Sequence, residues 1–206
     1  MGRPLPPSEI LEPTGRPRFE PSPELQEWAL STFIEDGADL ENEEHAHLKQ
    51  AEIGFLWTNV ANSRKQRRIV GQCETGKPQG AMGKWAKARA EAQIIGWFGF
   101  VPDFIITIDA HYASHCEDAE FMALIEHELC HASQERDEFG QPKFTREGKP
   151  VFGIRGHDVE EFISVVRRYG ADAAGIRDLI EAAKAGPEIA PARIAQSCGT
   201  CLSRAA

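Results

Sequence analysis

The sequence predicts a single α+β domain in which helices back a small mixed sheet, and two kinds of pattern carry this prediction. Apolar runs with many β-branched residues occupy 52–60, 67–74 and 102–110, as is typical of strands. Apolar or helix-favouring residues recur at helical spacing in 22–34, 84–98 and 118–135. The resulting order of strand, strand, helix, strand, helix favours an α+β architecture.

Composition narrows the functional classes. The chain has 206 residues, of which 41% are hydrophobic and 27% charged, which is typical of a globular domain. Its net charge of −9 makes nucleic acid an unfavourable partner, because a phosphate backbone requires a basic face. The five cysteines form no framework spacing, so we expect mostly free thiols in a reducing compartment.

The sequence contains no pattern that predicts export or membrane anchoring. The first residues contain no apolar signal-peptide core, and the most apolar stretch, 94–108, is interrupted by glycine, proline and aspartate. We therefore expect a cytoplasmic protein with no membrane partner. Nothing in the sequence predicts an oligomeric state.

Three regions are expected along the chain. Residues 1–22 are rich in proline and predict a flexible or surface-hugging arm. Residues 23–185 hold the domain proper, and 186–206 are expected to form a flexible tail. This tail contains Cys198 and Cys201 in "CGTC", half of a zinc-ribbon spacing or a redox pair, but no second pair follows, so no function is expected of it.

The first elements are a helix and a hairpin. Leu25, Trp28 and Phe33 recur at helical spacing after Pro23. The runs 52–60 and 67–74 are separated by a polar segment, which predicts a β-hairpin with the basic "RKQRR" solvated at its turn.

The next helix, 84–98, is rich in alanine and long unbranched side chains. We expect its buried apolar stripe to consist of Trp85, Ala88, Ala92 and Ile95. The strand at 102–110 follows, with "DFIITIDA" as a candidate edge strand. A further helix, capped by Glu117 or Asp118, should run to about Glu135 and bury an apolar stripe. The members of that stripe are Met122, Ile125, Leu129 and Ala132.

The stretch "FMALIEHELCHASQE" places two histidines four residues apart. On a helix, His127 and His131 project within roughly 40° of each other and one turn apart, so both imidazoles can reach one ion. His-Glu-x-x-His is the zincin spacing, in which two imidazoles bind Zn²⁺ and the glutamate, here Glu128, acts as the general base.

A catalytic zinc needs a third protein ligand, and the candidates lie in "RGHDVEEF". A helix over 156–170, with Val159, Phe162, Ile163 and Val166 as its apolar stripe, would turn three donors away from the core. His157 would complete a three-histidine site, whereas Glu160 or Glu161 would complete a site of two histidines and one carboxylate. Two other histidine pairs, His45 with His47 and His111 with His115, are expected to be solvated.

These motifs resemble one family. "HELCHA", the following "DEFGQPKFTREGKPVFGIRGHDVEEF" and "VVRRYGA", and the preceding "RRIVGQCE" and "FVPDFIITIDAHY" look like the putative phage metallopeptidase family, related in pattern to SprT-like zincins. The resemblance covers about residues 50–170. It implies a zincin-like fold, zinc ligands His127, His131 and His157, and Glu128 as the catalytic carboxylate. It also implies a phage or prophage gene expressed in a bacterial host.

Two functional classes follow. The favoured one is a zinc metallopeptidase that hydrolyses a protein or peptide substrate, with Arg155 and Tyr169 as the nearest candidates for stabilising the oxyanion. The alternative is an inactive or structural-zinc module that binds proteins. Glu128 favours the enzyme, because a purely structural site has no chemical need for a base beside its ligand.

Overall fold

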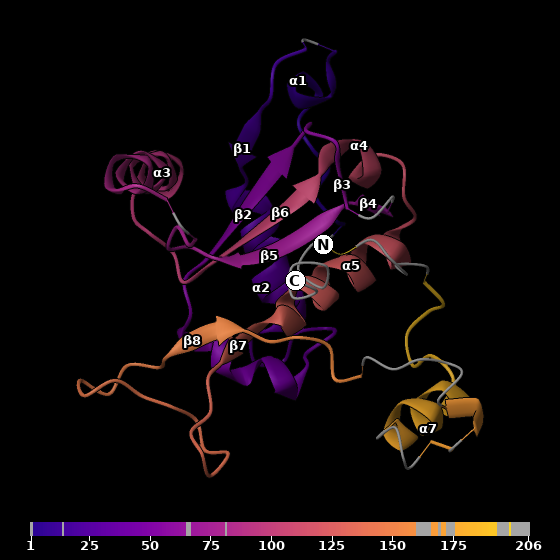
Figure 1. Ribbon diagram of the computed structural model, residues 1–206. Coiled ribbons are helices and arrows are strands. Elements are labelled where there is room, and N and C mark those ends of the chain that lie inside the picture. Colours follow the sequence, from indigo (N-terminus) through magenta and orange to yellow (C-terminus); the bar gives the residue numbers. More distant parts are fainter. Residues whose placement is uncertain are drawn as a thin grey trace.

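The computed structural model describes residues 2–13, 15–64, 67–80, 82–159, 166–168, 170–171, 176–192 and 198, and it has a mixed sheet covered by helices on both faces (Figure 1). The four strands lie in the order β1 (Phe19–Pro21), β2 (Ile53–Thr58), β6 (Phe104–Asp109) and β5 (Gly71–Thr75). The predicted α+β class and the small mixed sheet are confirmed.

Strand pairing differs from the predicted hairpin. β2 runs parallel to β6 from Ile53↔Phe104 to Thr58↔Asp109, and β5 runs antiparallel to the other side of β6. β2 and β5 therefore do not pair, and the segment between them forms its own small hairpin of β3 (Asn62–Arg64) and β4 (Arg67–Ile69). The prediction that β6 is an edge strand is also wrong, because β5 occupies that edge.

Every residue of β2 is buried, since the sheet has a hydrophobic layer on each side. Phe55, Trp57 and Ile106 belong to the larger core, whereas Leu56 and Ile105 pack with Ile94 on the opposite face. The continuous apolar runs in the sequence are thus typical of strands covered on both faces. Gly54 leaves room for the Phe98 ring, which a Cβ atom would approach to 2.6 Å.

Three helical elements cover the larger core. They are α2 (Pro23–Phe33), the 3₁₀ helix η1 (Glu43–Gln50) and α5 (Asp118–His131). The Ser22 side chain caps α2 by accepting a hydrogen bond from the Leu25 backbone N–H, with proline at the first helical position. The predicted helix after Pro23 is confirmed. A short helix, α4 (Ala110–Ala113), joins β6 to the segment before α5.

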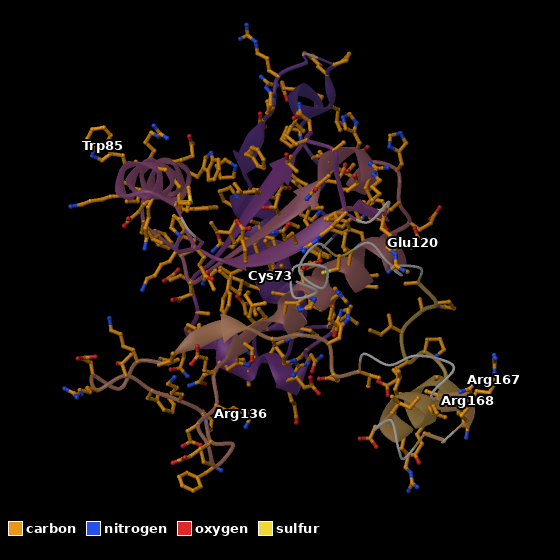
Figure 2. All side chains as sticks on the ribbon, in the orientation of Figure 1. Cys73, Trp85, Glu120, Arg136, Arg167 and Arg168 are labelled. Carbon is orange, nitrogen blue, oxygen red and sulfur yellow. The ribbon has the colours of Figure 1, made fainter. Side chains whose placement is uncertain are left out.

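The helix α3 (Lys84–Phe98) covers the opposite face, but not through the predicted stripe. Trp85 is 85% exposed and Ile95 44% exposed, whereas Ile94 is buried and Trp97 and Phe98 pack beside it. Figure 2 shows Trp85 pointing away from the sheet. Because α3 contacts the sheet mainly through its C-terminal half, the aromatic residue of its first turn lies outside the core.

The chain after α5 is less helical than predicted. α5 ends at His131 rather than near Glu135, and β7 (Ala132–Gln134) pairs with β8 (Phe152–Ile154). Residues 156–159 are not helical, so His157 does not begin a helix; 166–168 are helical, and the rest of the expected 156–170 helix lies outside the described residues. The last described helix is α7 (Arg177–Ala185).

The proline-rich N-terminal residues contribute two elements to the domain. α1 (Ser8–Leu11) buries Ile10 completely, and β1 pairs antiparallel with β2. Arg3 donates hydrogen bonds to the Ala113 and Cys116 carbonyl oxygens and lies over the Phe121 ring. The expected limits at residues 22 and 185 stay predictions.

Among the described residues, no helix is long and apolar enough to cross a membrane.

Candidate metal centre

The sequence His-Glu-Leu-Cys-His occupies the last turns of α5. Phe121, Leu124, Ile125 and Leu129 anchor this helix in the larger core, and all four are fully buried. His131 and Glu128 are buried as well, whereas His127 is partly exposed. The helix stops here because Ala132 adopts an extended conformation and starts β7.

Three imidazoles converge at the end of α5. The Nε2 atom of His127 lies 3.3 Å from Nε2 of His131 and 3.4 Å from Nε2 of His157. The His131 and His157 rings lie 5.2 Å apart between centroids. Nitrogen ligands at about 2.0–2.1 Å from a tetrahedral zinc are separated by roughly 3.3–3.4 Å, so the donor set fits such an ion.

A backbone carbonyl orients His131. The Nδ1 atom of His131 lies 2.7 Å from the Arg155 carbonyl oxygen, which can only accept a hydrogen bond. Nδ1 therefore carries the proton and Nε2 presents its lone pair to the centre. This arrangement is typical of metal-binding histidines, whose second nitrogen is commonly held by a carbonyl or carboxylate.

Glu128 is fully buried beside these rings. Burial raises the pKa of its carboxyl group to about 8, and the neighbouring Cys198 adds to that effect, while His127 and His131 oppose it. Gly71, at the start of β5, makes room for this side chain: a Cβ atom there would lie 2.9 Å from Glu128 Oε1 and from Leu124 Cδ1.

Cys198 lies at the same centre, although it is 67 residues from His131 in sequence. Its Sγ atom is 3.3 Å from His131 Nε2, and its backbone forms a parallel bridge with Gly71. The ligand atoms of His127, His131 and Cys198 lie within 4.8 Å of one another. The side chain is 6% exposed.

Not all of the predicted site residues meet here. Glu160, Glu161, Tyr169 and Cys201 lie outside the described residues. His45 and His47 were expected to be solvated, but His45 is buried and His47 is half-buried, with its Nε2 atom 2.9 Å from the Ala132 carbonyl oxygen; His111 and His115 are exposed. No disulfide joins the four cysteines that the structure describes, Cys73, Cys116, Cys130 and Cys198.

Sequence reasoning missed the contributions of Gly71, Cys198 and the Arg155 carbonyl. Gly71 and the Arg155 carbonyl had no local signal, because each acts through backbone geometry. Cys198 was visible as part of "CGTC", but its approach to α5 is a long-range contact that spacing cannot predict.

A groove of about 1540 Å³ begins beside this centre. β5 forms one wall, the β7–β8 hairpin another and α3 a third, and Arg155 and Gly156 lie at the end nearest His157. In Figure 1, β5 is the strand of the sheet nearest to this hairpin. The residues of β5 from Gln72 to Thr75 therefore line a groove whose lining ends at Gly156, the residue before His157.

Comparison with known proteins gives one match. No curated protein and no solved structure matches the chain. A family model described as putative phage metallopeptidase matches residues 26–184, which include α5, the β7–β8 hairpin and His157. The chain therefore belongs to the putative phage metallopeptidase family.

Proposed function

We propose that the protein is a zinc-dependent metallopeptidase of the zincin type, with His127, His131 and His157 as the ligands and Glu128 as the catalytic carboxylate. The convergence of three Nε2 atoms at 3.3–3.4 Å beside a buried glutamate carries this proposal. Family membership supports peptidase chemistry in general. Zinc, when bound, would polarise the peptide carbonyl and acidify the attacking water.

Glu128 has the position and environment of a general base. It follows His127 directly in α5, and its carboxyl group is fully buried beside the imidazoles, where it can contact a water that reaches the centre. In the proposed reaction it accepts a proton from the attacking water and later delivers one to the leaving amine. His131 stays fixed throughout by the Arg155 carbonyl.

We further propose that the substrate is an extended segment of a protein or peptide. β5 pairs with β6 along one edge; on its other edge Gly71 bridges Cys198, and the residues from Gln72 to Thr75 can form backbone hydrogen bonds with an added strand. The groove continues this edge past Gln72 and Glu74, which provides space for side chains on either side of the cleaved bond.

The experiment is Glu128→Gln in the full chain, with Glu120→Gln as the matched control on the first turn of α5 (Figure 2). Glu128→Gln should retain zinc, because the imidazoles are unchanged, and should lose about 10²- to 10⁴-fold in kcat on an unstructured protein substrate. Glu120→Gln should keep both the zinc and the cleavage activity. Full cleavage activity in Glu128→Gln, or no zinc in the wild-type protein, would contradict the proposal.

A second candidate is the structural-zinc module that binds proteins. Cys198 favours it, because a cysteine as a fourth donor is typical of closed structural sites. The two candidate functions predict different changes in peptidase activity when Cys198 is replaced.

A further inference from the structure

We propose that Cys198 is a fourth ligand that closes the metal site and keeps the enzyme latent. This inference rests on the proposed function, since latency has meaning only for an enzyme. It assigns to Cys198 a role that its sequence context, the "CGTC" of an expected tail, did not predict.

The first observation is the donor geometry. Cys198 and His157 each approach one of the two α5 histidines: Cys198 Sγ lies 3.3 Å from His131 Nε2, and His157 Nε2 lies 3.4 Å from His127 Nε2. A sulfur and a nitrogen bound to one tetrahedral zinc would be separated by roughly 3.6 Å. Three imidazoles and one thiolate form a complete ligand set, which leaves no position for a reacting water.

The second observation is where the Cys198 side chain lies relative to the base. Gly71, whose backbone bridges Cys198, also lies beside Glu128, since a Cβ atom on Gly71 would be 2.9 Å from Glu128 Oε1. A general base must contact the water that attacks the substrate. Cys198 contacts both His131 and Gly71, so it lies on the side of the centre where Glu128 would have to contact this water.

The third observation concerns the substrate edge. Gly71 pairs with Ile108 of β6 through one side, and its other side forms the parallel bridge with Cys198. An extended substrate that pairs with β5 near Glu128 would need the same edge of Gly71. Cys198 thus excludes both the water and the peptide backbone at one point.

The closing step is a ligand exchange. The Cys198 S–H bond breaks, its proton passes to solvent, and a sulfur–metal bond forms in place of a bond from water. Opening reverses each change: water replaces the sulfur, and the thiolate takes up a proton. No electron is transferred, so neither an oxidant nor a reductant is required.

The test compares wild type, Cys198→Ser and Cys198→Ala with Cys201→Ser, the matched control three residues along the same motif. Each full-length protein is loaded with Co²⁺, and the near-ultraviolet thiolate-to-cobalt charge-transfer absorption is recorded. Wild type and Cys201→Ser should show the band, and both Cys198 variants should lack it while still binding one cobalt per chain. Thermal unfolding verifies that each variant is folded.

The zinc-loaded proteins are then assayed on an unstructured protein substrate. Both Cys198 variants should exceed wild type at least about tenfold, the factor expected when one tenth or less of the chains is open. Adding Glu128→Gln to Cys198→Ser should abolish the gain.

The possible failures are distinguishable. No metal in any of the proteins overturns the proposed function itself. Metal bound by wild type without a thiolate band overturns closure by Cys198 and leaves the peptidase proposal standing. A thiolate band with no gain in activity in either Cys198 variant overturns latency and favours the structural-zinc module.

Discussion

Replacing Gly71 with alanine tests whether the start of β5 positions Glu128. The added Cβ would lie 2.9 Å from Glu128 Oε1, 2.9 Å from Leu124 Cδ1 and 3.3 Å from Glu128 Cγ. All three atoms belong to fully buried side chains, so the helix face must adjust. Inserting one methyl group into a packed core typically costs about 1–3 kcal/mol.

The effect on catalysis should exceed the effect on folding. A shift of the carboxylate by several tenths of an ångström alters its distance to the attacking water, and a displacement of about 1 Å can cost on the order of 10²-fold in rate. The three atoms nearest to the added methyl group belong to Glu128 and Leu124 rather than to an imidazole, so zinc content should be unchanged. Activity is measured in a Cys198→Ser background, which removes any contribution of Cys198, and stability is measured by urea denaturation.

Two glycine variants provide the controls for Gly71→Ala. Gly54→Ala places a Cβ 2.6 Å from the Phe98 ring on the opposite face, so it should lose comparable stability with unchanged activity. Gly96→Ala meets no heavy atom within 4 Å and should gain about 0.5–1 kcal/mol. The reasoning is refuted if Gly71→Ala matches wild type within about 0.5 kcal/mol and cleaves substrate at the same rate.

Three further predictions concern stability. Burial, aided by the charges of His47 and Arg155, lowers the pKa of His45 to about 4. Between pH 6.5 and pH 4 the unfolded chain therefore binds a proton that the folded protein does not. The free energy of unfolding should be highest above about pH 6.5 and should fall by up to about 3 kcal/mol as the pH drops to 4. Urea titrations across this range should show a smaller loss for His45→Gln, and an equal loss would contradict the assignment. Arg3→Ala should cost about 1.5–3 kcal/mol through its hydrogen bonds to carbonyl oxygens, and an unchanged melting temperature would show that the N-terminal contact is dispensable. Trp85→Ser should change the free energy of unfolding by no more than about 0.5 kcal/mol, whereas a large loss would show that Trp85 is packed.

Local periodicity predicted the elements well, because it depends on which face of one segment is apolar. The helix Pro23–Phe33 and the helix beginning at Asp118 follow from apolar spacing, and the strand Phe104–Asp109 follows from a compact run of β-branched residues. The stripe of α3 was wrong for a physical reason: an alanine-rich helix offers several equivalent faces, and contact with the sheet selects the one with Ile94. Local sequence contains no information about that contact.

The order of the strands in the sheet could not be predicted from the sequence. Two apolar runs separated by a short polar segment satisfy the criteria for a hairpin. In the structure a third strand, β6, lies between them, since the parallel β2–β6 pairing buries both strands on two faces. Because β6 lies inside the sheet, the edge strand is β5 rather than β6, and the proposed substrate position changes accordingly.

The donor set illustrates the same division between local and long-range information. His127 and His131 were predictable, because a four-residue spacing on a helix fixes their mutual direction. His157 was expected to project from a helix, but residues 156–159 are not helical, and His157 still approaches His127. It does so because the β7–β8 hairpin ends at Ile154 and returns the chain to α5. The Arg155 carbonyl, which orients His131, is delivered by the same return. One hairpin therefore supplies both a donor and the hydrogen bond that directs another donor, which is why residues far apart in the sequence form one centre.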